Sequence, residues 1–329
     1  MIPRRAVHEL VSGPCVGTRA LLLLLALGSV GEGVLAQEPS EIASSCEASG
    51  GDPARCLAAA VGGYALQGHV SLLASVGSPI PGTASNLGTR VGGGPRLSFF
   101  ARALTSKWGG PDPGNVLQES SPLVRAIQLG GAAGVFDGFR LMPTVGGFLA
   151  TDVFIDGTFM SPSEADGFSG SFRSYGLGVR IGVLREGFTV PGVSLSVARR
   201  FSGTVGAGDL DAGDDVRFTI DPAVTSVRAA VSKDLFAIEL LAGVGWDDFE
   251  ADATIGVSDG LGSSFQGAGS MAGSRRLFFG SAAMTFSLVL TLALDVGWAE
   301  GVGDVPGWSG AFDPGSGSLH GGLSARLVL

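Results

Sequence analysis

Residues 174–201 read SYGLGVRIGVLREGFTVPGVSLSVARRF, and this stretch decides the fold. Hydrophobic side chains occupy alternate positions from Tyr175 to Val183, while glycines and Arg180 occupy the positions between them. Because successive side chains of a β-strand point to opposite faces, one face of this strand is apolar and the other is small or charged. The alternation resumes at Val193 after a short polar break. The stretch therefore predicts a β-hairpin with one face suited to hydrocarbon.

The same alternation recurs to the end of the chain. The sequence is 45% hydrophobic and 16% charged, and its apolar residues are spread over short alternating segments. This distribution is typical of a transmembrane antiparallel β-barrel, whereas a membrane helix needs about 20 consecutive apolar residues. One uncharged run, residues 277–294, fits both a helical and a strand period, and the strands predicted on either side of it favour a strand.

Long polar loops alternate with short connections from residue 96 onward. We therefore expect residues 96–329 to form an all-β barrel of about ten strands, or twelve if residues 64–94 add a pair. An even number of strands would place both termini in the periplasm. Near Asp247 the apolar residues change from even to odd positions, which predicts a bulge or an additional turn.

Residues 1–36 have the features of a cleaved secretory signal. Arg4 and Arg5 precede an apolar core at residues 20–27, and the small-residue sequence Val-Leu-Ala ends at Ala36. The arginine pair also fits a twin-arginine signal, but it lies far from the apolar core. A barrel must cross the inner membrane unfolded, so we expect export through the general secretory pathway.

Residues 37–95 form a separate N-terminal segment ahead of the predicted barrel. Cys46 and Cys56 are a close pair in an exported protein, which predicts a disulfide. Asp52 followed by Pro53 is a favourable helix start, and we expect a short helix to about Ala60. The segment is predicted to lie in the periplasm or inside the barrel.

Charged residues of both signs share the face opposite the apolar one, and we predict that they line the lumen. These residues are Arg180, Arg200, Arg217, Arg228, Arg326, Asp215 and Asp221. In a wide barrel they would create the transverse field of a diffusion pore. In a narrow barrel they would pair with one another and fill the interior. The sequence leaves both arrangements open.

Little in the sequence points to catalysis, a cofactor or a metal. His69 and His320 are the only histidines after the predicted signal, and neither has the partners of a nucleophilic enzyme in sequence. Asp209, Asp211 and Asp214 are weak metal candidates, because this loop lacks the glycine and the closing glutamate of a calcium loop. We expect no enzyme activity, no cofactor and a solvated acidic loop.

The net charge of −9, without clusters of lysine or arginine, argues against a nucleic-acid partner. The sequence does not define an oligomeric state.

The last strand places Leu323, Ala325, Leu327 and Leu329 on one face. It resembles the terminal strand of bacterial outer-membrane barrels, which the outer-membrane assembly machinery recognises, although Leu329 replaces the usual aromatic residue. The resemblance implies the outer membrane of a Gram-negative-type bacterium, in contact with lipid and lipopolysaccharide.

The layout, with residues 37–95 ahead of the barrel, is similar to that of outer-membrane long-chain fatty-acid transporters. The leading hypothesis is therefore a porin-like barrel for passive transport of small solutes or hydrophobic compounds. The alternative is a non-transporting structural or surface-interaction barrel with a closed lumen.

Overall fold

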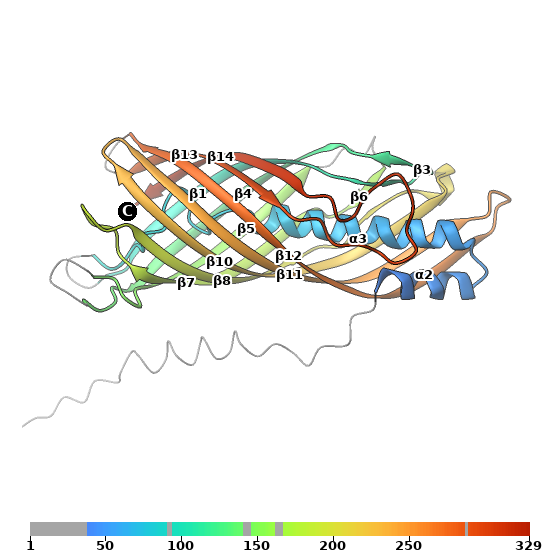
Figure 1. Cartoon of the computed structure of the whole chain (residues 1–329), viewed down its shortest axis with the longest axis horizontal. Coiled ribbons are helices and arrows are strands. Elements are labelled where there is room, and N and C mark those ends of the chain that lie inside the picture. Colours follow the sequence, from blue (N-terminus) through green and yellow to red (C-terminus); the bar gives the residue numbers. More distant parts are fainter. Residues whose placement is uncertain (1–37, 91–93, 141–145, 162–166, 287–288) are drawn as a thin grey trace, which may run out of the picture. The chain divides into compact units, whose positions relative to one another are not determined.

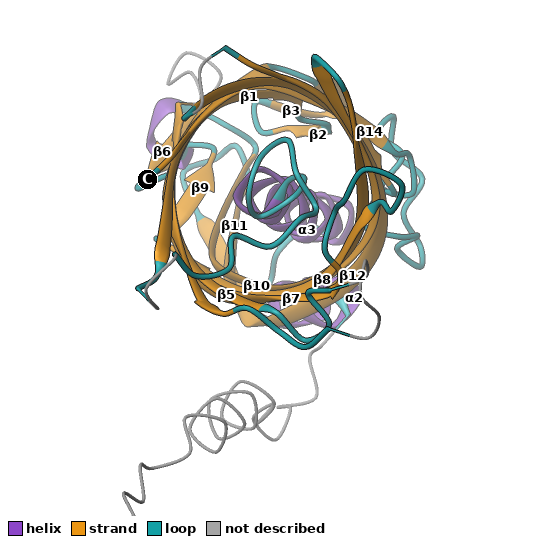
Figure 2. Cartoon of the chain, turned by 90° about the vertical axis from the view of Figure 1, so that its left-hand side faces the viewer, coloured by secondary structure: helices purple, strands orange, loops and turns teal. Residues whose placement is uncertain are grey.

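A computed structural model describes residues 38–90, 94–140, 146–161, 167–286 and 289–329. Ten antiparallel strands form a closed barrel, because each strand pairs with the next and β14 pairs with β1. Figures 1 and 2 show the barrel from the side and from one end. The strands are β1 (Arg96–Lys107), β4 (Leu123–Phe136), β5 (Thr151–Ser161), β7 (Arg173–Leu184), β8 (Gly192–Ser202), β10 (Val216–Leu235), β11 (Ile238–Ser258), β12 (Ser264–Thr285), β13 (Leu290–Ala299) and β14 (Ser318–Val328).

The predicted barrel class is confirmed, and so is the choice of strand over helix for residues 277–294. The hairpin that begins the sequence argument is formed by β7 and β8, which pair from Ser174 with Ser202 onward. Tyr175 and Leu177 lie on its exposed outer face. The uncharged run belongs to β12 and β13, joined by a short turn that lies partly outside the described residues.

The long connections gather at one end of the barrel. They contain the short strands β2 (Gly110–Asp112), β3 (Asn115–Ser120), β6 (Phe168–Gly170) and β9 (Val205–Ala207) and the 3₁₀ turn η2 (Leu210–Ala212). We call this the long-loop end and the opposite end the short-turn end. In outer-membrane barrels the long loops face the cell exterior and the short turns face the periplasm. The C-terminus lies at the short-turn end (Figure 1).

Two helices precede the barrel, α2 (Pro39–Ala48) and α3 (Pro53–Ser75). The predicted disulfide between Cys46 and Cys56 is present and joins them. Asp52 caps α3 by accepting a hydrogen bond from the amide of Arg55 at 3.0 Å. Figure 2 shows α3 inside the ring of strands.

Helix α3 is much longer than the sequence suggests. It continues beyond Ala60 to Ser75, and the described residues 76–90 contain no strand, so the described part of residues 64–94 adds no pair of strands to the barrel. The helix is long enough and apolar enough to cross a membrane, yet almost all of its side chains are buried inside the barrel. The alternation at residues 69–76 is therefore not a strand pattern. In a helix that is enclosed on all sides, polar and apolar side chains need not separate onto two faces, so a short alternation can occur without a strand.

The described chain begins at the long-loop end. Arg55, in the first turn of α3, forms an ion pair with Asp215 at 3.2 Å and donates a hydrogen bond to the carbonyl of Ser258. The chain then passes down the lumen before it enters β1 at the short-turn end. As an even number of strands requires, β1 begins and β14 ends at the same, short-turn end of the barrel. The described chain as a whole does not have both termini at one end, because its helices begin at the long-loop end.

Strands β10, β11 and β12 are the longest, and their outer and inner faces exchange character along their length. In β11, Val244 and Trp246 are exposed, whereas Phe249 and Ile255 on the opposite parity are buried. The pairing of β11 with both neighbours continues without a break through Asp247, so neither the predicted bulge nor the predicted turn occurs.

We call residues 216–224, 248–258 and 264–274 the outer extension. The rest of the barrel wall, with its exposed apolar outer face, is the membrane band.

Candidate functional site

The lumen is filled by α3 and residues 76–90, which together we call the plug. The surrounding wall contributes six buried arginines, which are Arg102, Arg180, Arg200, Arg228, Arg275 and Arg326. All six lie on the inward faces of their strands, opposite the exposed apolar side chains. Four of them are among the lumen-lining candidates from the sequence. Arg102 and Arg275 were missed. Arg102 lies between Ala101 and Ala103 and carries the same signal, whereas Arg275 lies between Ser274 and Arg276, so no alternation with apolar neighbours marks it.

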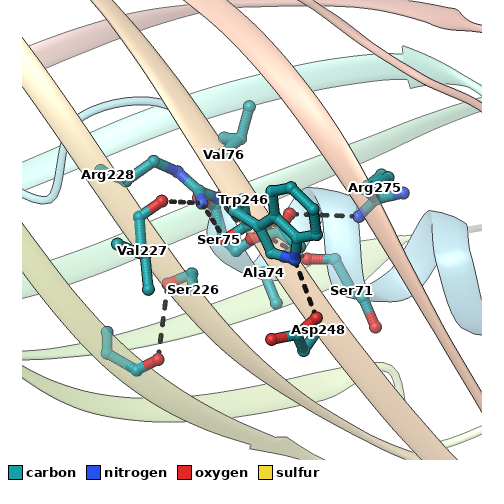
Figure 3. Close-up of polar contacts among 12 residues, drawn as sticks. Ser71, Ala74, Ser75, Val76, Ser226, Val227, Arg228, Trp246, Asp248 and Arg275 are labelled. Atoms are coloured by element: carbon teal, nitrogen blue, oxygen red, sulfur yellow. Dashed lines mark hydrogen bonds and ion pairs between the residues drawn. The ribbon is translucent and has the colours of Figure 1, made fainter.

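Three of these arginines bind the carbonyls of α3. Arg228 donates to the carbonyl of Ser75 at 2.8 Å, and Arg102 donates to that of Val76, at the end of the helix, at 2.8 Å. Arg275 donates to the carbonyl of Gly68 at 2.7 Å. Figure 3 shows Arg228 and Arg275 around the end of the helix. The carbonyls of Ser75 and Val76, at the end of the helix, lack partners within the helix and carry partial negative charge, so guanidinium groups satisfy and stabilise them. Gly68 lies about two turns earlier, where the bond from Arg275 is an additional one.

The rest of the plug is held in the same way. Arg326 donates to the carbonyl of Pro81 at 2.9 Å. Arg180 donates to the carbonyls of Thr83 and Ser85 at 3.1 and 2.8 Å. Asp152 accepts a hydrogen bond from the amide of Leu87 at 3.1 Å. Residues 76–90 have no regular secondary structure, and these hydrogen bonds to the wall hold them in place.

Each of these arginines also faces a carboxylate from the wall. The ion pairs are Arg180–Asp152 at 2.8 Å, Arg200–Asp156 at 2.9 Å, Arg228–Asp247 at 2.7 Å, Arg275–Asp247 at 3.5 Å, Arg102–Asp295 at 3.5 Å and Arg326–Glu239 at 3.8 Å. Because Asp247 is shared, the six buried arginines meet five carboxylates. Buried charges are tolerated only when paired and hydrogen-bonded, and this network provides both except for one excess positive charge near Asp247.

Two of the predicted lumen residues do not face the lumen. Arg217 and Asp221 lie on the exposed face of β10, in the outer extension. The prediction is wrong because it assumed that the apolar parity faces outward along the whole strand. Here Phe218 and Ile220 face inward and are fully buried in the core that encloses α3. Asp215 is half-buried at the mouth of the barrel, where it pairs with Arg55.

The acidic loop folds around its own backbone. Asp209 accepts a hydrogen bond from the amide of Asp211 at 3.0 Å, and Asp214 accepts one from the amide of Asp209 at 2.7 Å. Within the described parts of the chain, no three histidine, cysteine, aspartate or glutamate side chains are grouped to hold a metal ion. These aspartates therefore shape the loop.

His320 is buried on the inward face of β14, against Gly297. The nearby hydroxyl of Ser324 donates to Asp295 at 3.0 Å and not to the histidine. The geometry of a Ser–His nucleophile is therefore not formed here.

A cavity of about 380 Å³ lies at the long-loop end, between the plug and the wall. One side is formed by α3 through Ala65, Gly68, His69 and Leu72. The other sides are formed by Arg275 of β12, by the region where β1 ends, including Lys107 and Trp108, and by the connection between β13 and β14, including Val302 and Phe312. It is a mostly apolar cavity with a few charged groups.

Neither a known family nor a curated protein matches the sequence. Among solved structures, the chain is similar to the translocator domain of the autotransporter NalP from Neisseria meningitidis, with a TM-score of 0.39, 10% identity, and coverage of 71% of this chain and 88% of that one. It is also similar to the attachment invasion locus protein Ail of Yersinia pestis, with a TM-score of 0.29, 7% identity, and coverage of 71% and 98%. The NanC porin gives a TM-score of 0.28, 6% identity, and coverage of 69% and 100%.

These values describe a likeness of fold alone. The class of the protein follows from its own geometry, which is a closed antiparallel barrel with an apolar outer face and short turns at one end. This is the fold of Gram-negative outer-membrane proteins.

Proposed function

We propose that this protein is a closed outer-membrane barrel that acts at the bacterial surface and does not pass solutes through its lumen at rest. In this proposal residues 1–36 are removed after export through the general secretory pathway, and the assembly machinery inserts the barrel. The observation that supports closure is the attachment of the plug to the buried wall arginines at both α3 and residues 76–90.

Removing the plug would break many charge-assisted hydrogen bonds at once. Each such bond contributes about 1.5–3 kcal/mol to stability. Arg102, Arg180 and Arg228 each donate to at least one plug carbonyl, so displacement of the plug would leave their guanidinium groups without these partners. Spontaneous opening is therefore expected to be rare, and the exposed long-loop end becomes the functional surface, in contact with lipopolysaccharide.

Passive transport with a displaced plug is the second candidate. The cavity at the long-loop end favours it, because a solute could bind there before the plug moves. In that case the closed barrel would be the resting state of a gated transporter.

Planar-bilayer conductance of the refolded mature protein tests the proposal. The unmodified protein should be silent, whereas Arg102→Ala combined with Arg228→Ala should give conductance steps by loosening the end of α3. Arg217→Ala is the matched control, because this arginine lies on the exposed face of β10. Stable steps in the unmodified protein would overturn the proposal.

A further inference from the structure

We infer that the free edge of β12 in the outer extension binds an extended, basic segment of another protein, which adds a strand to the sheet there. Three features support this partner, namely backbone groups without partners, a sequence without the devices that protect an edge, and acidic side chains on both sides of it. The inference rests on the proposed surface role of the long-loop end. It does not depend on whether the lumen is closed.

The first feature is the unpaired backbone of β12. The strand pairs with β11 along its whole length but with β13 only from Leu277 onward, which leaves a free edge over residues 264–274. Arg276 shows which groups face this side, because its carbonyl accepts from the amide of Glu300 at 2.9 Å and its amide donates to the Glu300 carboxylate at 3.0 Å. The direction alternates along a strand, so every second residue presents its N–H and C=O to the free edge. These residues are Gln266, Ala268, Ser270, Ala272 and Ser274, and their backbone groups form no hydrogen bond with any other residue that the structure describes.

The neighbouring segments leave this edge open. After Glu300 the connection from β13 turns toward the plug, where the carbonyl of Val302 accepts a hydrogen bond from the Tyr64 hydroxyl at 2.7 Å. Helix α2 packs on the inner face of β12 at Gly267, and within the described ranges it forms no hydrogen bond with the edge. The opposite side of the extension differs, because β10 pairs with β9 and β9 pairs with β6.

The second feature is the lack of protection. Exposed edges normally carry charged side chains, a proline or a β-bulge that prevents pairing with another chain. Residues 264–274 read SFQGAGSMAGS and contain neither a charge nor a proline. Their pairing with β11 has no register shift and therefore no bulge. Such an edge is a template for an added strand, which binds mainly through its backbone.

The third feature is the charge around the edge. On β11, the outward-facing residues that pair with the edge strand include Asp248, Glu250 and Asp252. On the inner side, α2 carries exposed Glu41 and Glu47 and no basic residue. Neighbouring strands lie about 5 Å apart, so a long basic side chain of an added strand reaches the acidic row across the small side chains of β12. A basic segment therefore complements this edge.

Two arginines near this row do not neutralise it. Arg199 pairs with Glu250, and Arg276 lies over an aromatic ring. Asp252 lies opposite Asp221 of β10, and neither forms an ion pair with a described residue. Like charges directly opposite one another destabilise a sheet, so a cation from a partner would relieve this repulsion.

A second copy of this chain fits the edge poorly. Strands of outer-membrane barrels are tilted by about 35–45°. Where two barrels in one membrane face each other, their strands tilt in opposite directions. The two copies of β12 would therefore cross instead of pairing along their length, whereas a segment of another protein has no such restriction.

Calorimetric titration of the mature protein in phosphatidylcholine nanodiscs tests this inference. The probe is a capped peptide of alternating threonine and lysine, long enough to pair with residues 266–274. We expect saturable binding at one site per protein, after subtraction of empty nanodiscs. The same peptide methylated at every backbone nitrogen keeps its charges but lacks N–H donors, and it should bind at least tenfold more weakly. Equal affinity for the two peptides, or no binding above empty nanodiscs, would overturn the inference.

A peptide with glutamate in place of lysine tests the charge of the partner. It has the same backbone groups, but it should bind at least tenfold more weakly than the lysine peptide because the acidic row repels it. Equal binding of the two would contradict a basic partner.

Hydrogen exchange in the unmodified protein locates the added strand. The amides of Gln266, Ala268, Ser270 and Ala272 should become protected when the lysine peptide binds, because they face the free edge. The amides between them already face β11 and should change little. Unchanged exchange at the edge amides with the peptide bound would place it elsewhere and contradict the inference. This readout needs no variant, so it stays valid if a variant fails to fold.

Variants add a matched test. Ser270→Pro removes one N–H from the free edge and none from the pairing with β11, so it should weaken binding at least tenfold, whereas Ser270→Ala should leave it unchanged. Asp252→Asn should weaken binding several-fold, and Asp234→Asn at the short-turn end should have no effect. Equal binding to the proline and alanine variants would contradict the inference. Conductance is a separate readout, so failure of the closed-barrel proposal would be seen independently.

Discussion

Strands β10, β11 and β12 run through both the membrane band and the outer extension, yet their faces are opposite in character in the two regions. In the membrane band, Val244 and Trp246 face outward and Arg228 faces inward. In the outer extension, Glu250 faces outward and Phe249 faces inward. The strand pairing is continuous, so the difference arises from the surroundings. The exposed apolar outer face of the membrane band suits lipid, whereas the charged outer face of the extension suits water, and the inner face of the extension packs against the first half of α3.

The two regions also hold the plug by different forces. In the extension, Phe218 and Met271 pack against α3, and a Cβ atom on Gly62 would lie 2.5 Å from the ring of Phe218. In the membrane band, arginine–carbonyl bonds and ion pairs act together with smaller apolar clusters, which include Leu72 and Ile80 of the plug. The inner face of the membrane band also carries buried arginines, aspartates and serines, so polar groups bind the plug there.

The largest effect should come from removing the shared carboxylate of the membrane band. Asp247→Ala leaves Arg228 and Arg275 buried without their counter-charge, and loss of a buried partner typically costs about 3–5 kcal/mol. Urea-induced unfolding of the refolded protein measures this loss. The matched control is Asp248→Ala, one position along on the exposed face, which should change the free energy of unfolding by less than about 0.5 kcal/mol. Similar losses in both variants would contradict the assignment of faces.

A charge placed on the outer face separates the two regions directly. Val244→Lys should destabilise the barrel by about 2–4 kcal/mol if Val244 lies near the bilayer midplane, with a smaller cost nearer the interface. Asp252→Lys, on the same outward face in the extension, should have almost no effect, because water already surrounds it. Unfolding in bilayers of defined thickness measures the change in the free energy of unfolding for both variants. Equal costs would show that the extension also lies in lipid.

The apolar packing of the extension should tolerate little added volume. Gly62→Ala forces its new methyl group against Phe218, and overpacking of this kind costs about 1–3 kcal/mol. Gly187→Ala is the control, since nothing lies within 4 Å of a Cβ atom there. The thermal transition of both variants, followed by circular dichroism, provides the comparison. An unchanged transition in Gly62→Ala would show that α3 does not pack tightly in the extension.

Much of this architecture could be predicted from alternation alone. The barrel class and the inward positions of Arg180, Arg200 and Arg228 follow from the strand period, and the disulfide follows from the close cysteine pair in an exported protein. The change of parity at Asp247 was also visible. The structural meaning of this change could not be predicted, because alternation shows that the two faces of a strand differ and does not show which face points into the barrel.

The plug was the main element that could not be predicted from the sequence. Helix α3 is apolar on all sides and contains three glycines, Gly62, Gly63 and Gly68, so it has neither an amphipathic pattern nor strong helix propensity. Its burial depends on the barrel strands, which follow it in the sequence, so the sequence of the helix alone does not show that it is enclosed. The errors at Arg217 and Asp221 have the same cause, because without the plug there is no reason for an apolar face to turn inward.

The smallest predicted effect concerns pH at the short-turn end. Asp137 accepts hydrogen bonds from Thr89 and Arg185, which hold the pKa of its carboxyl below the ordinary value. A lowered pKa in the folded state contributes stability above the unfolded-state pKa, and this contribution is lost as the pH falls through the folded pKa. The protection of the amides at residues 87–90, measured as their exchange rate relative to the intrinsic rate at the same pH, should therefore fall in acid, and Asp137→Asn should remove that dependence. A dependence that persists in the variant would assign it to another group.

Hydrogen exchange along α3 tests the central claim most directly. In the mature protein in nanodiscs, the amides of residues 62–75 should exchange as slowly as those of the paired strands β10 and β11, because the closed barrel encloses the helix. Exchange of these amides as fast as that of the exposed tip at residues 259–263 would contradict a plug held in a closed lumen.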